Sequence, residues 1–130
     1  MDFKIKICSI TLDSKDSDAL SDFYAALLGW QKNSGEPEFI GVSTPGEFPV
    51  LWFQQVDDYQ PPVWPEEADA QQQMVHIDFV VDDVKKAVRH ALACGATKSP
   101  NQYHDRWTVM FDPAGHPFCL SEYKAFFDKD

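Results

Sequence analysis

The chain has 130 residues, of which 44% are hydrophobic and 14% aromatic, and a formal net charge of −10. This length and composition predict one compact domain with its own core. The acidity argues against a nucleic-acid backbone or an anionic membrane surface as a partner. No apolar run approaches ~18 residues, and the first residues lack a basic and then apolar leader, so we expect neither a membrane span nor a signal peptide. Three cysteines without CxxC spacing favour a reducing cytoplasm over a disulfide framework or structural zinc.

The first half of the chain predicts a strand, a helix and three short strands. Residues 4–12 alternate between apolar and polar positions, as in a half-buried strand. Apolar residues at helical spacing predict a helix over 16–28, with Asp16 or a neighbouring serine as its N-cap and Gly29 as its C-cap. Short strands are expected near 30–33, 37–44 and 49–55.

The second half repeats this order. A strand is predicted over 74–81, with Val75 and the alternate apolar residues on one face and His76 and Asp78 on the other. A helix over 83–94 follows, capped by Asp82 or Asp83 and closed by Gly95. Strands are then expected near 96–99, 105–111 and 117–123.

The two halves align as an internal repeat. A shift of 67 residues places Ser9 on His76, and a shift of 68 places Pro45 on Pro113 and Leu51 on Cys119. We therefore predict an α+β domain over 1–130, made of two βαβββ modules at about 4–55 and 74–123.

A long connection, residues 56–73, joins the modules and has no steady periodicity. A segment of this length in a small domain is either a linker or a binding loop. Tyr59 and Trp64 are its candidate anchors: they either pack the linker against itself or cover a pocket.

Several motifs resemble those of the vicinal-oxygen-chelate superfamily, which includes glyoxalase I, bleomycin-resistance proteins and extradiol dioxygenases. Asp16 with Phe23-Tyr24 and Leu28-Gly29-Trp30 resembles its opening "D-x6-FY-x3-LGW". Residues 76–83 and 112–119 resemble its closing "H-x-x-F-x-V-x-D … DP-x-G-N", and within the superfamily the chain is most similar to the small glyoxalase-like group. The resemblance implies that the two modules form a curved, partly open barrel around a cavity. Relatives of this size are often homodimers.

The resemblance also implies four metal-ligand positions, one on the first and one on the last strand of each module. They fall on Ser9, Leu51, His76 and Cys119. Leu51 cannot ligate a metal and Ser9 is a poor ligand, so a divalent ion would keep two protein ligands where stable sites use three or four. We therefore expect no metal cofactor.

Strand alternation and the resemblance together give a set of residues facing the cavity. The set mixes apolar and hydrogen-bonding side chains, as small-molecule pockets do. Arg106 and Trp107 are expected at its rim. The predicted lining comprises Ser9, Thr11, Leu51, Phe53, His76, Asp78, Cys119 and Ser121.

Each reactive residue of this set has two interpretations. His76 and Asp78 are either an acid–base pair or a histidine held to satisfy buried polarity. Cys119 is either a nucleophile with His76 as its base or an ordinary buried cysteine. Arg106 is either a counter-ion for an acidic ligand or a surface residue paired with a nearby aspartate.

The sequence therefore predicts a protein of the bleomycin-resistance type that binds a small organic molecule without a metal. The alternative is a lyase, isomerase or dioxygenase-type enzyme that uses His76 and Asp78, with or without a divalent metal. A third hypothesis is a cavity filled by its own side chains in a protein that acts through association. Lactoylglutathione lyase activity is not expected, because in relatives it relies on the metal and its glutamate.

Overall fold

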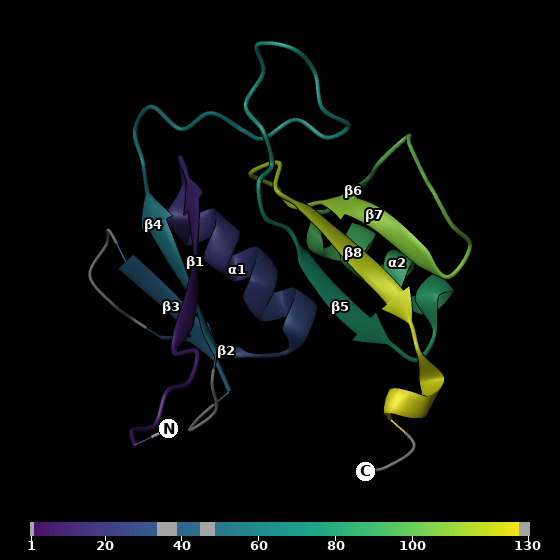
Figure 1. Cartoon of the computed structure of the whole chain (residues 1–130), viewed down its shortest axis with the longest axis horizontal. Coiled ribbons are helices and arrows are strands. Elements are labelled where there is room, and N and C mark those ends of the chain that lie inside the picture. Colours follow the sequence, from purple (N-terminus) through teal and green to yellow (C-terminus); the bar gives the residue numbers. More distant parts are fainter. Residues whose placement is uncertain (1, 34–38, 45–48, 128–130) are drawn as a thin grey trace. The chain divides into compact units, whose positions relative to one another are not determined.

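The computed structural model describes residues 2–33, 39–44 and 49–127 (Figure 1). The chain divides into two compact units, Met1–Tyr59 and Gln60–Asp130. Each unit contains one βαβββ module, and each module forms a four-stranded mixed sheet with one helix. The predicted fold class, α+β with two such modules, is confirmed.

The first module begins with strand β1 (Ser9–Ser14) and helix α1 (Ser17–Leu28). Strands β2 (Gln31–Asn33), β3 (Phe39–Ser43) and β4 (Val50–Gln55) complete a sheet of order β1-β4-β3-β2, in which β1 runs parallel to β4. Residues 37–38 of the predicted second short strand lie outside the described residues. The Asp16 carboxylate accepts the Ala19 N–H at 3.0 Å and caps α1, and Gly29 ends the helix with φ of 69°.

The core of this module lies between α1 and one face of the sheet (Figure 1). Phe53 is fully buried and its ring stacks on Tyr24 of α1, with 5.6 Å between centroids. Leu51, two residues earlier on the same face, is 5% exposed. Parallel pairing sets Ile10 beside Leu51 and Leu12 beside Phe53, so these four residues face the helix.

The second module repeats the pattern with β5 (Ile77–Val81) and α2 (Val84–Cys94). Strands β6 (Thr97–Lys98), β7 (Trp107–Phe111) and β8 (Pro117–Glu122) give the order β5-β8-β7-β6, and a 3-10 turn (Lys124–Phe126) follows. Asp83 caps α2 by accepting the Lys86 N–H at 3.1 Å, and this hydrogen bond lowers the pKa of the carboxyl. Gly95 ends the helix with φ of 119°.

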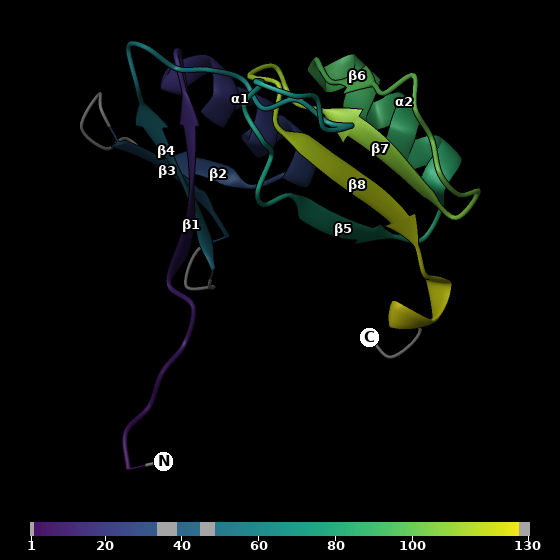
Figure 2. The ribbon, with the colours of Figure 1, turned by 45° about the horizontal axis from the view of Figure 1, so that its top comes forward.

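Figure 2 shows α2 against one face of this sheet. Phe118, Leu120 and Met110 are buried on that face, and Phe118 meets Phe79 edge-on at 5.8 Å. We call the opposite side of each sheet its helix-free face.

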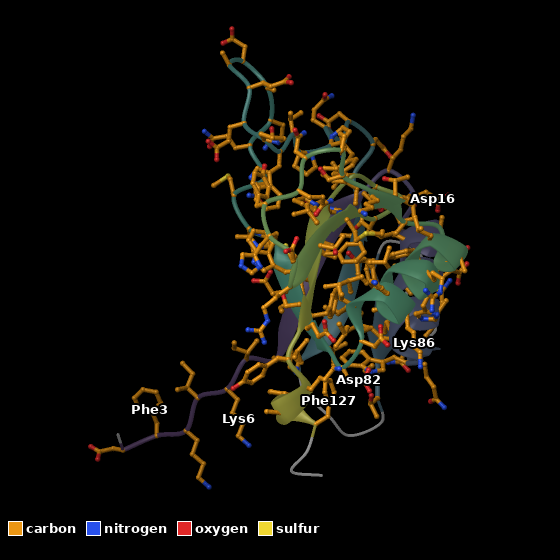
Figure 3. The ribbon with its side chains drawn as sticks, turned by 90° about the vertical axis from the view of Figure 1, so that its right-hand side faces the viewer. Phe3, Lys6, Asp16, Asp82, Lys86 and Phe127 are labelled. Atoms are coloured by element: carbon orange, nitrogen blue, oxygen red, sulfur yellow. The ribbon has the colours of Figure 1, made fainter. Side chains whose placement is uncertain are left out.

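The first strand of each module starts well after its expected first residue. The first was expected from residue 4, yet β1 starts at Ser9, and Phe3, Ile5 and Ile7 are 64%, 71% and 67% exposed. Figure 3 shows Phe3 and Lys6 on an extended segment that leads away from β1. Alternation alone predicted a strand there, but sheet pairing begins only where β4 provides a partner.

The strand predicted over 74–81 begins at Ile77. Met74 has a left-handed φ of 57°, so the chain turns there, and Val75 is 75% exposed instead of buried. His76 therefore lies immediately before β5 rather than within it.

Within the described ranges, the structure contains no helix of the length and apolarity needed to cross a membrane.

Candidate functional site

Three chemically reactive side chains converge on the helix-free face of the second module. Register pairs Asp78 of β5 with Cys119 of β8, and His76 precedes Asp78 by one pleat. The Nε2 atom of His76 lies 3.3 Å from Oδ1 of Asp78. One ligand-type atom of each of His76, Asp78 and Cys119 lies within 4.8 Å of the other two. Strand alternation predicted this grouping, and the structure brings the three residues together.

The imidazole of His76 is held from several sides. Its Nδ1 lies 3.1 Å from Oε1 of Gln73, and Nε2 faces the Asp78 carboxylate. The neutral ring can donate to one of these oxygens and the imidazolium can donate to both. The indole of Trp64 stacks on the ring at a centroid distance of 5.1 Å and an angle of 21°. This fixed orientation suits a group that gives or takes a proton.

Trp64 also begins a continuous row of rings, which we call the aromatic stack. Tyr103 stacks on Trp64 at 5.8 Å, and Trp107 stacks on Tyr103 at 5.9 Å. His104 closes the row on Trp107 at 6.2 Å with nearly parallel planes. His76 stacks on the opposite end of this row, against Trp64. The stack contains one residue of the predicted rim, Trp107.

The thiol of Cys119 is buried beside the carboxylate. Burial raises the pKa of Cys119 to about 12, and the hydrogen bond and negative charge of Asp78 add to this shift. Cys119 is 2% exposed. The thiol is therefore protonated at neutral pH and donates to Asp78, which is the opposite of what a nucleophilic thiolate needs.

Two further predicted residues belong to β8 and to the turn before β7. Ser121 lies on the same face as Cys119 and pairs in register with Trp107 of β7. Arg106 occupies the exposed turn before β7, where its backbone N–H donates to Nδ1 of His104 at 3.0 Å. Asp112, an aspartate that could have paired with Arg106, follows the other end of β7 and pairs with His116.

In the first module the predicted set divides between the two faces of the sheet. Ser9 and Thr11 lie on the helix-free face, in register with Val50 and Trp52. Leu51 and Phe53 face the helix and form the core, so the prediction that all four share one face is wrong. The same shift of 67 relates Ile10 to Ile77 and Leu51 to Phe118. The counterpart of Cys119 is therefore Trp52, not Leu51.

A tight turn, residues 112–116, supports the far end of the sheet. The Asp112 carboxylate is fully buried and accepts the backbone N–H groups of Ala114 and His116 at 2.9 and 3.0 Å. Its second oxygen lies 2.9 Å from Nδ1 of His116. His116 is thus a structural partner of Asp112.

The residues that could hold a metal are His76, Asp78 and Cys119. The resemblance placed His76 and Cys119 at ligand positions of the superfamily, and in the structure the Asp78 carboxylate lies beside them. One imidazole, one carboxylate and one thiol fit a borderline ion such as zinc in type and number. Their matching positions in the first module, Ser9, Thr11 and Trp52, add no strong ligand.

A hollow of about 390 Å³ lies at the start of α2, where Asp82, Lys86 and Phe127 come together (Figure 3). Asp83 and Lys124 complete its lining. Its two carboxylates balance its two ammonium groups, and Asp83 already serves as the helix cap. We assign it no ligand.

Sequence reasoning missed Gln73 and Tyr103, both of which lie outside the named strands and helices. It named Trp64 as a candidate pocket cover but did not predict that Trp64 stacks on His76. The one signal for Tyr103 was the closely spaced aromatic sequence Tyr103-His104 and Trp107.

Solved structures with the same fold come from several bacteria. A glyoxalase/bleomycin resistance protein/dioxygenase family enzyme from Burkholderia phytofirmans is 23% identical, with a TM-score of 0.64 over 88% of this chain and 95% of that one. A glyoxalase family protein from Enterococcus faecalis is 24% identical, with a TM-score of 0.61 over 94% and 100%. TnmS3, an antibiotic-binding protein from Streptomyces, is 17% identical, with a TM-score of 0.59 over 92% and 96%. At these identities the similarity establishes the fold.

No curated protein matches the sequence significantly. The family described as "Glyoxalase-like domain" matches residues 9–121, from the first residue of β1 to the penultimate residue of β8. That span includes both modules, the connection between them and the His76–Asp78–Cys119 group. The chain belongs to the glyoxalase-like domain family.

Proposed function

We propose that this protein binds a small organic molecule on the helix-free face of its second module. His76 and Asp78 hold the polar group of the ligand, and the aromatic stack lies beside its planar part. The observation that carries this proposal is the convergence of His76, Asp78 and Cys119 next to the face of Trp64. Ser121 and Trp107 extend the same surface.

We infer that binding does not require a metal. Asp78 already pairs with His76 and accepts from Cys119, so the three groups satisfy one another as hydrogen-bonding partners. Their ligand atoms lie up to 4.8 Å apart, whereas the ligands of a tetrahedral zinc ion lie roughly 3.3–3.8 Å from one another, given bond lengths of about 2.0–2.3 Å. A metal would require this group to contract and Cys119 to lose its proton.

The alternative is a lyase, isomerase or dioxygenase-type enzyme. The His76–Asp78 pair favours it, because a carboxylate that orients an imidazole is a common acid–base arrangement. If a metal is bound, His76, Asp78 and Cys119 would hold it, and it would supply Lewis acidity to a bound carbonyl or hydroxyl group. In either case His76 holds or moves a proton at Nε2.

Ser9 and Thr11 remain proposed ligand contacts from the first module, and Arg106 remains a proposed counter-ion at the rim. The free cysteines agree with a reducing compartment, so we infer a cytoplasmic location. A homodimer also stays a prediction, which native mass spectrometry would test.

A thermal-shift screen of metabolites and aromatic antibiotics tests the proposal. We expect at least one compound to raise the Tm of the wild type and His76→Ala to bind it at least tenfold more weakly. This loss follows from removing a hydrogen bond worth about 1.5–3 kcal/mol when one partner is charged. His90→Ala, which changes a histidine on α2, is the matched control. Equal affinity for wild type and His76→Ala would remove His76 from the site.

A further inference from the structure

The second module has a pocket of about 650 Å³ whose lining includes none of His76, Asp78 and Cys119. Its walls are the segment 61–64, the end of α2 and start of β6 at Gly95 and Thr97, and residues 111–115. This volume falls in the range of small-molecule sites, roughly 300–1,000 Å³.

The walls of this pocket present apolar surface and no available charge. Three prolines, Val63, Trp64, Phe111 and Ala114 form most of the lining. Asp112 is the one charged residue of the lining, and its fully buried carboxylate already accepts from Ala114 and His116. Thr97 supplies the one side-chain hydroxyl. In a chain of net charge −10, such a lining selects a neutral ligand.

Both long walls are held in place without a ligand. The N–H of Val63 donates to the carbonyl of Gln71 at 2.8 Å, and Trp64 is stacked on its neighbours. At the opposite wall, Gly115 approaches so closely that an added Cβ would lie 3.1 Å from Cβ of Pro61. A ligand would therefore lose little free energy in ordering the site.

Trp64 is shared between this pocket and the candidate functional site. It lines the pocket, and its ring stacks on His76 at 5.1 Å. Trp64 therefore connects the pocket to the His76 ring.

We propose that this pocket binds a neutral molecule containing an aromatic ring. Aromatic and proline surfaces favour a flat apolar ring, and the buried, paired Asp112 offers nothing to a cation or an anion. The proposal does not rest on the proposed function, because the pocket lining includes none of His76, Asp78 and Cys119. It adds a second site that communicates with His76 through Trp64.

Indole is a suitable probe, followed by isothermal titration calorimetry and by the NMR signal of the His76 ring. We expect a Kd on the order of 1 mM or tighter, at least tenfold weaker binding of indole-3-acetate and tryptamine, and a shift of the His76 signal on saturation. Absence of indole binding, or equal binding of the charged analogues, would overturn the proposal. An unmoved His76 signal would overturn the link through Trp64.

Thr97→Trp fills the pocket from an exposed strand position and should weaken indole binding at least tenfold. Lys98→Trp is the matched control, because Lys98 adjoins Thr97 on β6 and is absent from the lining. It should bind indole within twofold of the wild type. Ala114→Leu fills the same pocket from the other wall and serves if Thr97→Trp does not fold. Equal losses in the filling and control variants, or no loss in either, would contradict the assignment.

Discussion

Asp78 is the residue on which the hydrogen bonding of the site converges. Its carboxylate faces Nε2 of His76 at 3.3 Å and accepts from the buried thiol of Cys119. Its side chain is also 64% exposed, so it remains open to solvent and to a ligand. A carboxylate with two internal partners and a free edge can bind a hydroxyl or amine without losing its support.

The state of Cys119 gives a testable prediction at this scale. At pH 8, iodoacetamide should label the exposed Cys8 at least a hundredfold faster than Cys119, because Cys119 is buried and its pKa is raised to about 12. Peptide mass mapping measures both rates. Asp78→Asn should speed labelling of Cys119 several-fold by removing the charge that raises its pKa, whereas Asp105→Asn should not. Equal rates for Cys8 and Cys119 would contradict this arrangement.

The same thiol makes stability depend on pH. The folded state keeps the Cys119 proton up to about pH 12, whereas an ordinary thiol with a pKa of 9.0 has released it. The contribution of the protonated Cys119 thiol to the free energy of unfolding is therefore complete below about pH 9, and it is lost as the pH rises towards 12. Within this window the free energy of unfolding should fall by about 1.4 kcal/mol per pH unit.

Residues on strands could be predicted from the sequence because alternation has a period of two. This placed His76 and Asp78 on one face, although β5 itself begins after His76. Gln73 and Tyr103 could not be predicted, because their positions depend on loop geometry and on contacts distant in sequence.

At the scale of elements, the register of the last strand in each module decides which residues face the helix. The sequence repeat gave a shift of 68 at the prolines, although Pro45 lies outside the described residues. The strand pairs follow a shift of 67. The proline alignment therefore placed the last strand one residue out of register. A one-residue slip in a strand moves every side chain to the opposite face. This reversal explains the misplacement of Leu51 and Phe53.

The contact between the 112–116 turn and the 61–64 segment predicts how a substitution at Gly115 changes the stability of the protein. Gly115→Ala should destabilise the protein by about 1–3 kcal/mol, because φ is 92° and the new Cβ would meet Pro61 at 3.1 Å. Gly29→Ala is the control: φ is 69°, but nothing lies within 4 Å, so only backbone strain of about 1 kcal/mol applies. Urea denaturation measures both. A cost for Gly115→Ala no greater than that for Gly29→Ala would show that the contact is absent.

The structure also bears on the role of the connection predicted over 56–73. Both interpretations, a linker packed by its own aromatics and a pocket cover, were open from the sequence. Trp64 contacts His76 and Tyr103 and lines a pocket, which favours the binding-loop interpretation for its part of the segment. Only the tertiary contacts of Trp64 could decide this, because the segment lacks periodicity.

At the scale of the whole molecule, the family membership and the fold follow from motifs spread across both modules. The ligand does not follow from them, because one fold supports many unrelated functions. Among the residues that the structure describes, one group of ligand-type side chains comes together, and it lies in the second module. The equivalent positions of the first module hold Ser9, Thr11 and Trp52. The two modules therefore share a fold and differ in chemistry.

The hydrogen bonding within the His76–Asp78–Cys119 group leads to a prediction about metal content. The purified protein should contain well under one equivalent of nickel, zinc, iron or manganese by elemental analysis, and chelator should leave its Tm unchanged. The reason is that the His76–Asp78–Cys119 group is already satisfied internally. Stoichiometric metal that leaves together with stability would support the metal-dependent alternative.

The most direct test of a metal-free binding site is a calorimetric titration of the compound that gives the largest thermal shift, performed with chelator present. We predict the same Kd with and without chelator for the wild type, and at least a tenfold increase in Kd for His76→Ala and for Trp64→Ala. Binding that disappears with chelator and returns with zinc, or that is unchanged in both variants, would contradict a metal-free site at His76 and Trp64.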